Sequence, residues 1–214
     1  NITSPEDNFW EKVGGFIYES YLTSGEAQFR FLPQKRRYVA ELQGVNLLIR
    51  SDILVKLGGF KSRLYSGDDS KVCSNIRALD YKIIYDPDVI VYHHRRAFPL
   101  EHLKQIRNMG THRGFFVKAY PQTLAPIYFL PSILTVGFFT GLVFSFTSEN
   151  IRIGFGTLLL FFFILGFFSV LKKAGIRKSL FISLGIILTH IVYGIFFIRG
   201  FFLNSIERKN NETE

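Results

Sequence analysis

Two adjacent carboxylates, Asp68 and Asp69, are the residues of this sequence whose type and position best suit acid–base chemistry. They follow Gly67 and precede Ser70 at an expected helix start, where the positive end of the helix dipole favours negative side chains. A carboxylate held there can remove a proton from a hydroxyl group, and the charge of its neighbour raises its proton affinity. The alternative is that both residues only cap the helix.

A second group of polar residues is the run of two histidines and two arginines from His93 to Arg96. His93 could be a metal ligand, although a histidine beside arginines is more often a surface residue or a diphosphate contact. The nearby cations could neutralise a diphosphate or lie on anionic lipid headgroups, and their place before apolar sequence favours headgroups for most of them. These cations are Arg95, Arg96, Lys104, Arg107, Arg113 and Lys118.

Short predicted strands and helices alternate around these residues. Gly58 and Gly59 follow the first of these helices, and glycine is the common residue just past a helix end. The alternation predicts an α/β fold for the first 118 residues. The predicted strands cover 43–49, 81–85 and 89–92, and the predicted helices cover 51–57, 67–79 and a segment from 99 onward, with a turn at 86–88.

The composition narrows the class of protein. A formal charge of +9 in 214 residues indicates an anionic partner. A hydrophobic fraction of 48% with 20% charged residues excludes general disorder. The single cysteine, Cys73, excludes a disulfide framework and a cysteine-based zinc site. Nucleic acid would also explain the charge, but no basic recognition helix or stacking sheet is recognisable, so we expect no nucleic-acid partner.

Three long stretches without Asp, Glu, Lys or Arg occupy the second half of the chain, at 119–148, 153–171 and 179–198. Each approaches or exceeds the roughly 20 apolar residues that cross a bilayer as a helix. Buried core helices are the alternative, but the polar part of the chain is too short to cover three of them. We therefore predict a membrane domain at 119–206, with spans at about 130–147, 152–171 and 179–202 and a tail at 207–214.

The cations between these stretches predict the orientation. Segment 172–178 carries four cations, whereas segment 148–152 carries only Arg152 beside Glu149. The excess of cations places 172–178 in the cytoplasm, together with residues 1–120, and three spans would leave the tail outside. The expected location is therefore a cell membrane, with the polar half in the cytoplasm.

The order of several short motifs resembles the acceptor-side half of a family 2 glycosyltransferase. The resemblance covers about residues 36–120 and continues into the membrane half, where Thr189-His190-x-x-Tyr193-Gly194 is similar to the last span of bacterial members. The motifs are Gly44-x-Asn46, Leu57-Gly58-Gly59-Phe60, Gly67-Asp68-Asp69, Tyr85-Asp86-Pro87-Asp88, Val91-Tyr92-His93 and Gln105-x-Arg107-x-x-Gly110.

The resemblance implies the C-terminal half of a GT-A-like nucleotide-diphospho-sugar transferase domain, followed by three transmembrane helices. It implies inverting transfer of a sugar from a nucleotide-diphosphate donor to a lipid-linked or glycan acceptor, in surface polysaccharide synthesis. Asp69 then inherits the role of catalytic base, with Asp68 as its neighbour in the catalytic pair. The implied acceptor or substrate contacts are Gly44, Asn46, Arg95, Arg96, Gln105 and Arg107.

The sequence departs from the family pattern at the metal site. Such enzymes hold Mg²⁺ or Mn²⁺ against the diphosphate through an Asp-x-Asp motif in an N-terminal donor half. The one such triplet here, at 86–88, is a turn in the wrong place, and His93 is the only other ligand that relatives of this fold suggest. We therefore expect a C-terminal fragment of a longer enzyme that would supply the metal site.

A function of another class is also compatible with the sequence. The chain could be a non-catalytic anchor with three spans and a small cytoplasmic domain that binds a partner. Strand–helix units with an Asp-x-Asp motif upstream of Asn1 would favour the enzyme over this anchor.

Overall fold

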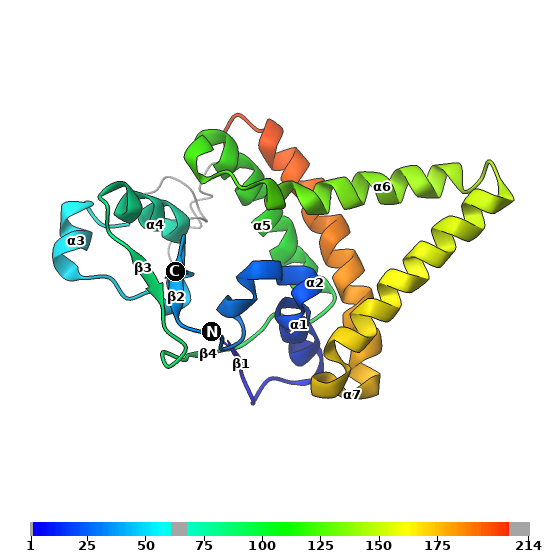
Figure 1. Ribbon diagram of the computed structural model, residues 1–214, viewed down its shortest axis with the longest axis horizontal. Helices are drawn as coiled ribbons and strands as arrows, with labels where there is room; N and C mark the ends of the chain where they lie inside the picture. The colour runs from blue at the N-terminus through cyan, green and yellow to red at the C-terminus, as the bar shows by residue number, and fades with distance from the viewer. Residues whose placement is uncertain (1, 61–67, 206–214) are drawn as a thin grey trace, which may run out of the picture.

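A computed structural model describes residues 2–60 and 68–205 (Figure 1). Gly67 of the predicted helix start and the predicted tail at 207–214 lie outside the described residues. The fold is mostly helical, with 70% helix and 5% strand. Its helices are α1 (Phe9–Glu19), α2 (Tyr21–Ser24), α3 (Ser51–Lys56), α4 (Asp68–Ala78), α5 (Leu100–Ala119), α6 (Leu130–Phe144) and α7 (Glu149–Phe202); short 3-10 helices are η1 (Gly25–Arg30), η2 (Gly44–Asn46), η3 (Pro121–Thr123) and η4 (Pro126–Phe129).

The predicted α/β fold, and with it the half of a GT-A-like sheet, is wrong for the part of the chain that the structure describes. The strands are β1 (Ile2–Thr3), β2 (Arg37–Val39), β3 (Ile83–Tyr85) and β4 (Tyr92–His93). They form two separate pairs, β1 parallel to β4 and β2 antiparallel to β3, instead of one layered sheet. Because each strand has only two or three residues, these pairs are too small to form the hydrophobic face of a sheet.

The expected strand at 43–49 shows why the prediction failed. Its residues have β propensity, but that preference depends on packing against neighbouring strands. Leu48 is 85% exposed, and the backbone forms the short helix η2, in which the Asn46 N–H donates to the Gln43 carbonyl at 3.0 Å. The segment therefore forms a turn and extended chain rather than a strand.

The helices of the polar half agree with the expectations. Helix α3 ends at Lys56, and Gly58 and Gly59 follow with φ of 75° and 79°, a conformation that glycine adopts without steric cost. Helix α4 carries Asp68 and Asp69 in its first turn, and α5 follows Pro99. Local capping and turn signals predicted these three elements, because they depend on neighbouring residues.

Helix α7 consists of two halves. Gly175 has φ 75° and ψ 164°, which no helix contains, and the chain reverses there (Figure 1). The two halves, 149–174 and 176–202, pack together, because a Cβ added at Gly166 would lie 3.3 Å from the Ser183 Cα. By length and composition, both α7 and the segment Pro126–Phe144 are apolar enough to cross a membrane.

The second half of α7 is the element on which α1 and α5 of the polar half pack. Val13 and Ile17 of α1 and Phe98 share a core cluster with Ile182 and Ile186 of α7, all at most 6% exposed. The predicted boundary near residue 118 therefore marks a change in composition but not a boundary between separately packed domains, because α1 lies directly against the apolar half.

Helix α5 runs parallel to the second half of α7. Near its start, His102 Nε2 lies 3.0 Å from Thr189 Oγ1. Near its end, Lys118 Nζ donates to the Leu203 carbonyl at 2.9 Å. The two helices therefore stay together from residue 189 to the end of α7.

Candidate functional site

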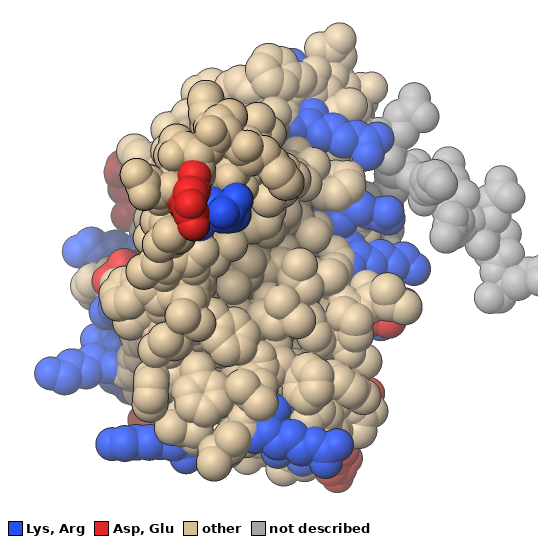
Figure 2. Space-filling view, turned by 90° about the vertical axis from the view of Figure 1, so that its right-hand side faces the viewer, with Lys and Arg blue, Asp and Glu red and all other residues tan. Residues whose placement is uncertain are grey.

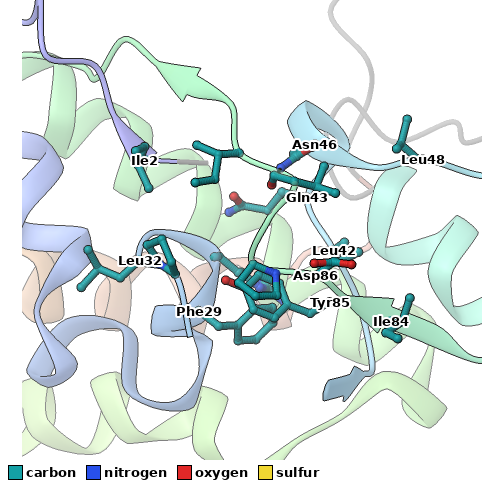
Figure 3. Close-up of a pocket in the computed structure, with 15 residues that line it drawn as sticks. Ile2, Phe29, Leu32, Leu42, Gln43, Asn46, Leu48, Ile84, Tyr85 and Asp86 are labelled. Carbon is teal, nitrogen blue, oxygen red and sulfur yellow. Dashed lines mark hydrogen bonds between the residues drawn. The ribbon is translucent and has the colours of Figure 1, made fainter. Parts of the chain in front are cut away.

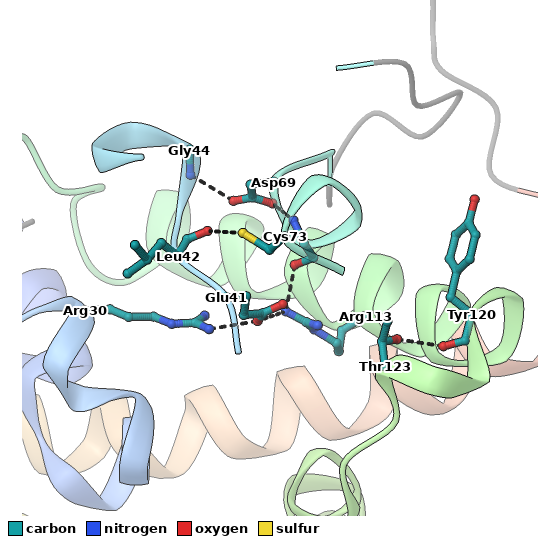
Figure 4. Close-up of polar contacts among 10 residues, drawn as sticks. Arg30, Glu41, Leu42, Gly44, Asp69, Cys73, Arg113, Tyr120 and Thr123 are labelled. Atoms are coloured by element: carbon teal, nitrogen blue, oxygen red, sulfur yellow. Dashed lines mark hydrogen bonds and ion pairs between the residues drawn. The ribbon is translucent and has the colours of Figure 1, made fainter. Parts of the chain in front are cut away.

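Asp69 contacts the predicted acceptor motif, although the two lie 25 residues apart (Figure 4). Its Oδ2 accepts a hydrogen bond from the Gly44 N–H at 3.1 Å, and its Oδ1 accepts one from the Ser70 N–H at 2.8 Å. Two backbone donors thus fix the orientation of this carboxylate at the start of α4. Such a carboxylate can cap a helix and can also accept a proton from a bound hydroxyl group.

Asp68 lies beside it with one oxygen unsatisfied. Its Oδ1 is buried and has no hydrogen-bond partner among residues 2–60 and 68–205. Burial of an unpaired carboxylate oxygen costs free energy, so a donor at this point would be stabilised. The start of α4 therefore combines a carboxylate held by backbone donors with a buried carboxylate oxygen that has no partner among residues 2–60 and 68–205.

A pocket of about 280 Å³ opens next to the Gly44 contact (Figure 3). Gln43 and Asn46, which flank Gly44 and Val45 in the sequence, contribute polar groups to the pocket wall. Phe29 contributes apolar surface. Asn46 is fixed there because its Nδ2 donates to the Val89 carbonyl at 3.0 Å. Apolar surface with a few fixed polar groups is the usual composition of a small-ligand site.

Asp86 also lines this pocket, in the turn that the sequence predicts. Its Oδ1 accepts a hydrogen bond from the Asp88 N–H at 3.1 Å, and its other oxygen pairs with Arg36. Both oxygens of Asp86 thus have partners in the chain. The triplet 86–88 is a turn that closes one side of the pocket, as expected.

Glu41 is the principal polar residue of the site that the sequence did not indicate. It lies between two arginines, with Oε1 2.8 Å from Arg30 and 2.9 Å from Arg113 (Figure 4). Burial alone would raise the pKa of Glu41, but the charges of Arg113 and Arg30 outweigh it and lower the pKa to about 2. Glu41 is therefore ionised at neutral pH and serves as an anchor for both arginines.

Arg113 joins the site to the rest of the molecule. Besides Glu41, it contacts Ser70 Oγ at 3.4 Å, directly after Asp69 in α4. Its guanidinium group also lies 4.7 Å from the ring centre of Tyr128, which is in η4 just before α6. One side chain of α5 thus links the carboxylate helix to the start of the apolar half.

The predicted contacts Arg95 and Gln105 lie in a different cluster. The Arg95 guanidinium is 5.3 Å from the Phe31 ring, and its backbone N–H donates to Asp7 Oδ2 at 3.1 Å. Gln105 Oε1 accepts from the Tyr18 hydroxyl at 3.3 Å. Tyr18 and Phe31 stack on each other at 5.1 Å, so these two predicted residues gather around Tyr18 rather than around α4.

Arg96 and Arg107 are exposed cations. The Arg96 carbonyl lies against α1, where it would collide with a Cβ added at Gly14, and the Arg107 guanidinium is 5.9 Å from the Phe196 ring. The structure therefore brings together Gly44, Asn46, Asp68 and Asp69 and places the predicted arginines elsewhere.

His93 lies in β4, and its Nδ1 is buried with no hydrogen-bond partner in the described chain. Burial, and then the charge of Arg95, lower the pKa of His93, so its imidazole is neutral. A neutral imidazole nitrogen can bind a metal, but the residues described contain no group of three His, Cys, Asp or Glu that could hold one. His93 alone does not make a metal centre.

No protein-family model, curated protein or solved structure matches this chain. The functional argument therefore depends on the residues themselves and on the geometry described above. Glu41 could not have been found from the sequence, because its two partners lie 11 and 72 residues away and no motif surrounds it.

Proposed function

We propose that this chain forms the acceptor side of a membrane-bound inverting glycosyltransferase, in which Asp69 is the catalytic base. The enzyme would transfer a sugar from a nucleotide-diphospho-sugar to a lipid-linked or glycan acceptor in surface polysaccharide synthesis. The observation that carries the proposal is the hydrogen bond between Gly44 and Asp69 beside the pocket. It joins two motifs whose order resembles family 2 glycosyltransferases.

In this mechanism the acceptor hydroxyl lies between the pocket and α4. The Asp69 carboxylate accepts the hydroxyl proton while the acceptor oxygen attacks the anomeric carbon of the donor sugar. The nucleotide diphosphate leaves from the opposite face, so the anomeric configuration inverts. The two backbone N–H groups that bond Asp69 hold its oxygens in place, which lowers the cost of orienting the base.

The mechanism contains no step through a metal ion. The resemblance implies Mg²⁺ or Mn²⁺ at the donor diphosphate, but His93 has no second ligand in a suitable group among the described residues. The chemistry assigned to this chain is limited to acceptor binding and removal of the acceptor proton.

Exposed apolar side chains support the membrane location. Figure 2 shows a broad surface nearly free of charged side chains, with Lys and Arg gathered along its lower edge and its sides. Such an area is too apolar to face water in a monomeric protein. We assign it to lipid contact by α6, by residues 149–174 and by the turn between them. Its most exposed members include Ile133, Val143, Phe146, Ile153, Leu158 and Phe168, each at least 60% exposed.

The second half of α7 has a different environment. Helix α5 lies alongside it and carries exposed Lys104 and Arg107, whose burial in a bilayer would be costly. We therefore place 176–202 along the membrane surface, in place of the third span that its composition predicts. The outward residues fit this position, because Leu180, Leu184, Ile195 and Phe202 form one exposed stripe at helical spacing.

Sugar transfer in native membranes tests the proposed function. Radiolabelled UDP-, GDP- and dTDP-sugars would be supplied with polyprenyl phosphate, and the anomeric configuration of the product would be determined by NMR. We expect transfer from one donor class with inverted configuration. Retained configuration would contradict a base mechanism at Asp69, and absence of transfer from every donor would contradict the enzyme assignment.

A further inference from the structure

We infer that the α7 bend, defined as residues 172–178, and the start of α1 together bind anionic lipid headgroups. The bend contains four cations: Lys172, Lys173, Arg177 and Lys178. It lies at the bottom of Figure 1, at the end of the apolar half-helix 149–174. This inference goes beyond sugar transfer and does not require it.

The cations of the bend are held in place by aromatic rings of α1. The Arg177 guanidinium lies 5.2 Å and the Lys178 ammonium 5.6 Å from the centre of the Phe9 ring. Such cation–π contacts fix the position of a charge without neutralising it. The first turn of α1 thus arranges two cations side by side.

Three of the four charges remain available for an anion. Lys173 pairs with the buried carboxylate of Glu19. Lys172, Arg177 and Lys178 form no ion pair with a carboxylate in residues 2–60 and 68–205. The bend therefore presents three uncompensated positive charges on one short segment.

Apolar side chains beside these charges favour a lipid surface over a free anion or a nucleic acid. Trp10 is 40% exposed, and its ring lies 4.9 Å from Phe181 and 5.0 Å from Phe9. Ile176, inside the bend, is 69% exposed. Tryptophan and cations at the end of an apolar helix are the combination found at the membrane–water interface, and the cytoplasmic leaflet is the anionic one.

Trp10 allows a direct test, because it is the only tryptophan of the chain. The protein would be reconstituted in phosphatidylcholine vesicles that contain equal small fractions of spin-labelled phosphatidylglycerol or spin-labelled phosphatidylcholine. We expect the anionic label to quench Trp10 fluorescence more strongly, by roughly twofold or more, since each nearby cation attracts anionic lipid. The preference should weaken as salt is added, because salt screens exposed charges.

Two matched variants distinguish an effect of the cations in the bend from an effect of the protein's total positive charge. Lys172→Gln with Arg177→Gln and Lys178→Gln should abolish the preference for the anionic label. Lys35→Gln with Lys56→Gln and Lys82→Gln removes the same charge from exposed residues outside the bend and should preserve it.

Equal quenching by both labels in the native protein would overturn the inference. So would a preference for the anionic label that persists in the bend variant or disappears in the control variant. A preference that does not respond to salt would also contradict it. Sugar transfer by the complete enzyme is measured separately, in native membranes. An Asp69→Asn variant that loses transfer but keeps the lipid preference would show that the two activities are independent.

Discussion

At the residue scale, two carboxylates near the start of α4 have opposite environments. Glu41 lies between Arg30 and Arg113, which hold its pKa at about 2, so it is a poor acceptor for a hydroxyl proton. Asp69 is bonded by the backbone N–H groups of Gly44 and Ser70 and by no arginine in the contacts described above. In the proposed mechanism, this difference favours Asp69 over Glu41 as the acceptor of the proton, while Glu41 holds the two arginines.

His102 gives a prediction about pH. Its side chain is fully buried in the contact between α5 and α7, and burial lowers its pKa from near 6.5 to about 4. The unfolded chain therefore takes up a proton at higher pH than the folded chain does. The stability that the neutral imidazole contributes is complete above about pH 6.5 and is lost as the pH falls toward 4, by up to about 3 kcal/mol.

Thermal unfolding between pH 7.5 and 4 in a non-ionic detergent measures this effect, with roughly half-unit steps in pH. The His102→Gln variant should show a flatter dependence of unfolding free energy on pH in that window. Parallel curves for the native chain and the variant would contradict the assigned environment of His102. The unfolding free energy that depends on ionised Glu41 is lost at lower pH, between about 4.5 and 2, so it is largely separate from the effect of His102.

The sequence indicated part of the site at this scale. Gly44 and Asp69 come into contact across 25 residues, as their shared place in the motif order suggests, although the backbone at Gly44 and Asn46 forms η2 rather than the predicted strand. The role of Glu41 could not be predicted, because it depends on tertiary contacts. Arg95 and Gln105 were expected near the acceptor and instead lie around Tyr18.

At the element scale, Glu41 ties α5 to η1 through its ion pairs with Arg113 and Arg30. Glu41→Gln removes one partner of two largely buried arginines, each with 18% of its side chain exposed. We expect a loss of about 2–4 kcal/mol of unfolding free energy, since breaking a buried pair leaves an uncompensated charge.

Glu26→Gln is the matched control for this variant. Glu26 pairs with Arg37 at 3.7 Å, but its side chain is 84% exposed, so the change should stay within about 0.5 kcal/mol. Denaturant titration of both variants measures the difference. Equal effects at the two positions would mean that the Glu41 contact does not stabilise the fold.

Close packing of α5 on α7 depends on glycine. A Cβ added at Gly114 would collide with the backbone of Phe197, whereas one added at Gly137 in α6 meets nothing within 4 Å. Gly114→Ala should therefore lower the unfolding free energy by about 1–3 kcal/mol. Gly137→Ala should be neutral or stabilising by up to about 1 kcal/mol, because alanine favours helix.

Denaturant titration of the two alanine variants tests this packing. If Gly114→Ala is as well tolerated as Gly137→Ala, helix α5 does not lie against α7 as described. A large loss for both variants would instead show that α6 is packed by protein at Gly137.

The elements illustrate what sequence reasoning can and cannot reach. Helices α3, α4 and α5 were predicted from glycines, helix-start carboxylates and a proline, which act within a few residues. The α/β fold was wrong because strands need partners, and the described strands find only one partner each. Helix α1 was not predicted, although it carries a local start signal: Asn8 accepts from the N–H groups of Trp10 and Glu11, and the Glu11 side chain accepts from the Asn8 N–H.

At the scale of the whole molecule, the protein consists of an apolar hairpin and a helical body that carries most of the charged residues. The hairpin consists of α6 and residues 149–174, and the body is built on residues 176–202 (Figure 1). Composition predicted the apolar half but could not distinguish a helix across the bilayer from one along its surface. That distinction depends on α5, whose contact with α7 is tertiary.

Cysteine labelling in intact cells tests this topology. In a Cys73→Ser background, a maleimide that cannot cross membranes should label Glu149→Cys from outside. Ile176→Cys and Asn204→Cys should remain unlabelled until the cells are opened, because the proposed topology puts the bend and the end of α7 on the cytoplasmic side. Labelling of Asn204→Cys from outside would restore the third span, and labelling of Ile176→Cys would reverse the orientation.

The proposed function depends on removal of the acceptor proton by Asp69, and this step is tested by comparing the turnover of Asp69→Asn and Asp68→Asn in the complete enzyme. The asparagine keeps the size of the side chain and one acceptor oxygen but cannot take up the proton. Turnover of Asp69→Asn should fall by roughly 10²–10⁴, the usual contribution of a general base, with donor binding and thermal midpoint little changed. Asp68→Asn should lose far less. Equal, small losses that follow lost stability in both variants would contradict the account and leave both aspartates as helix caps.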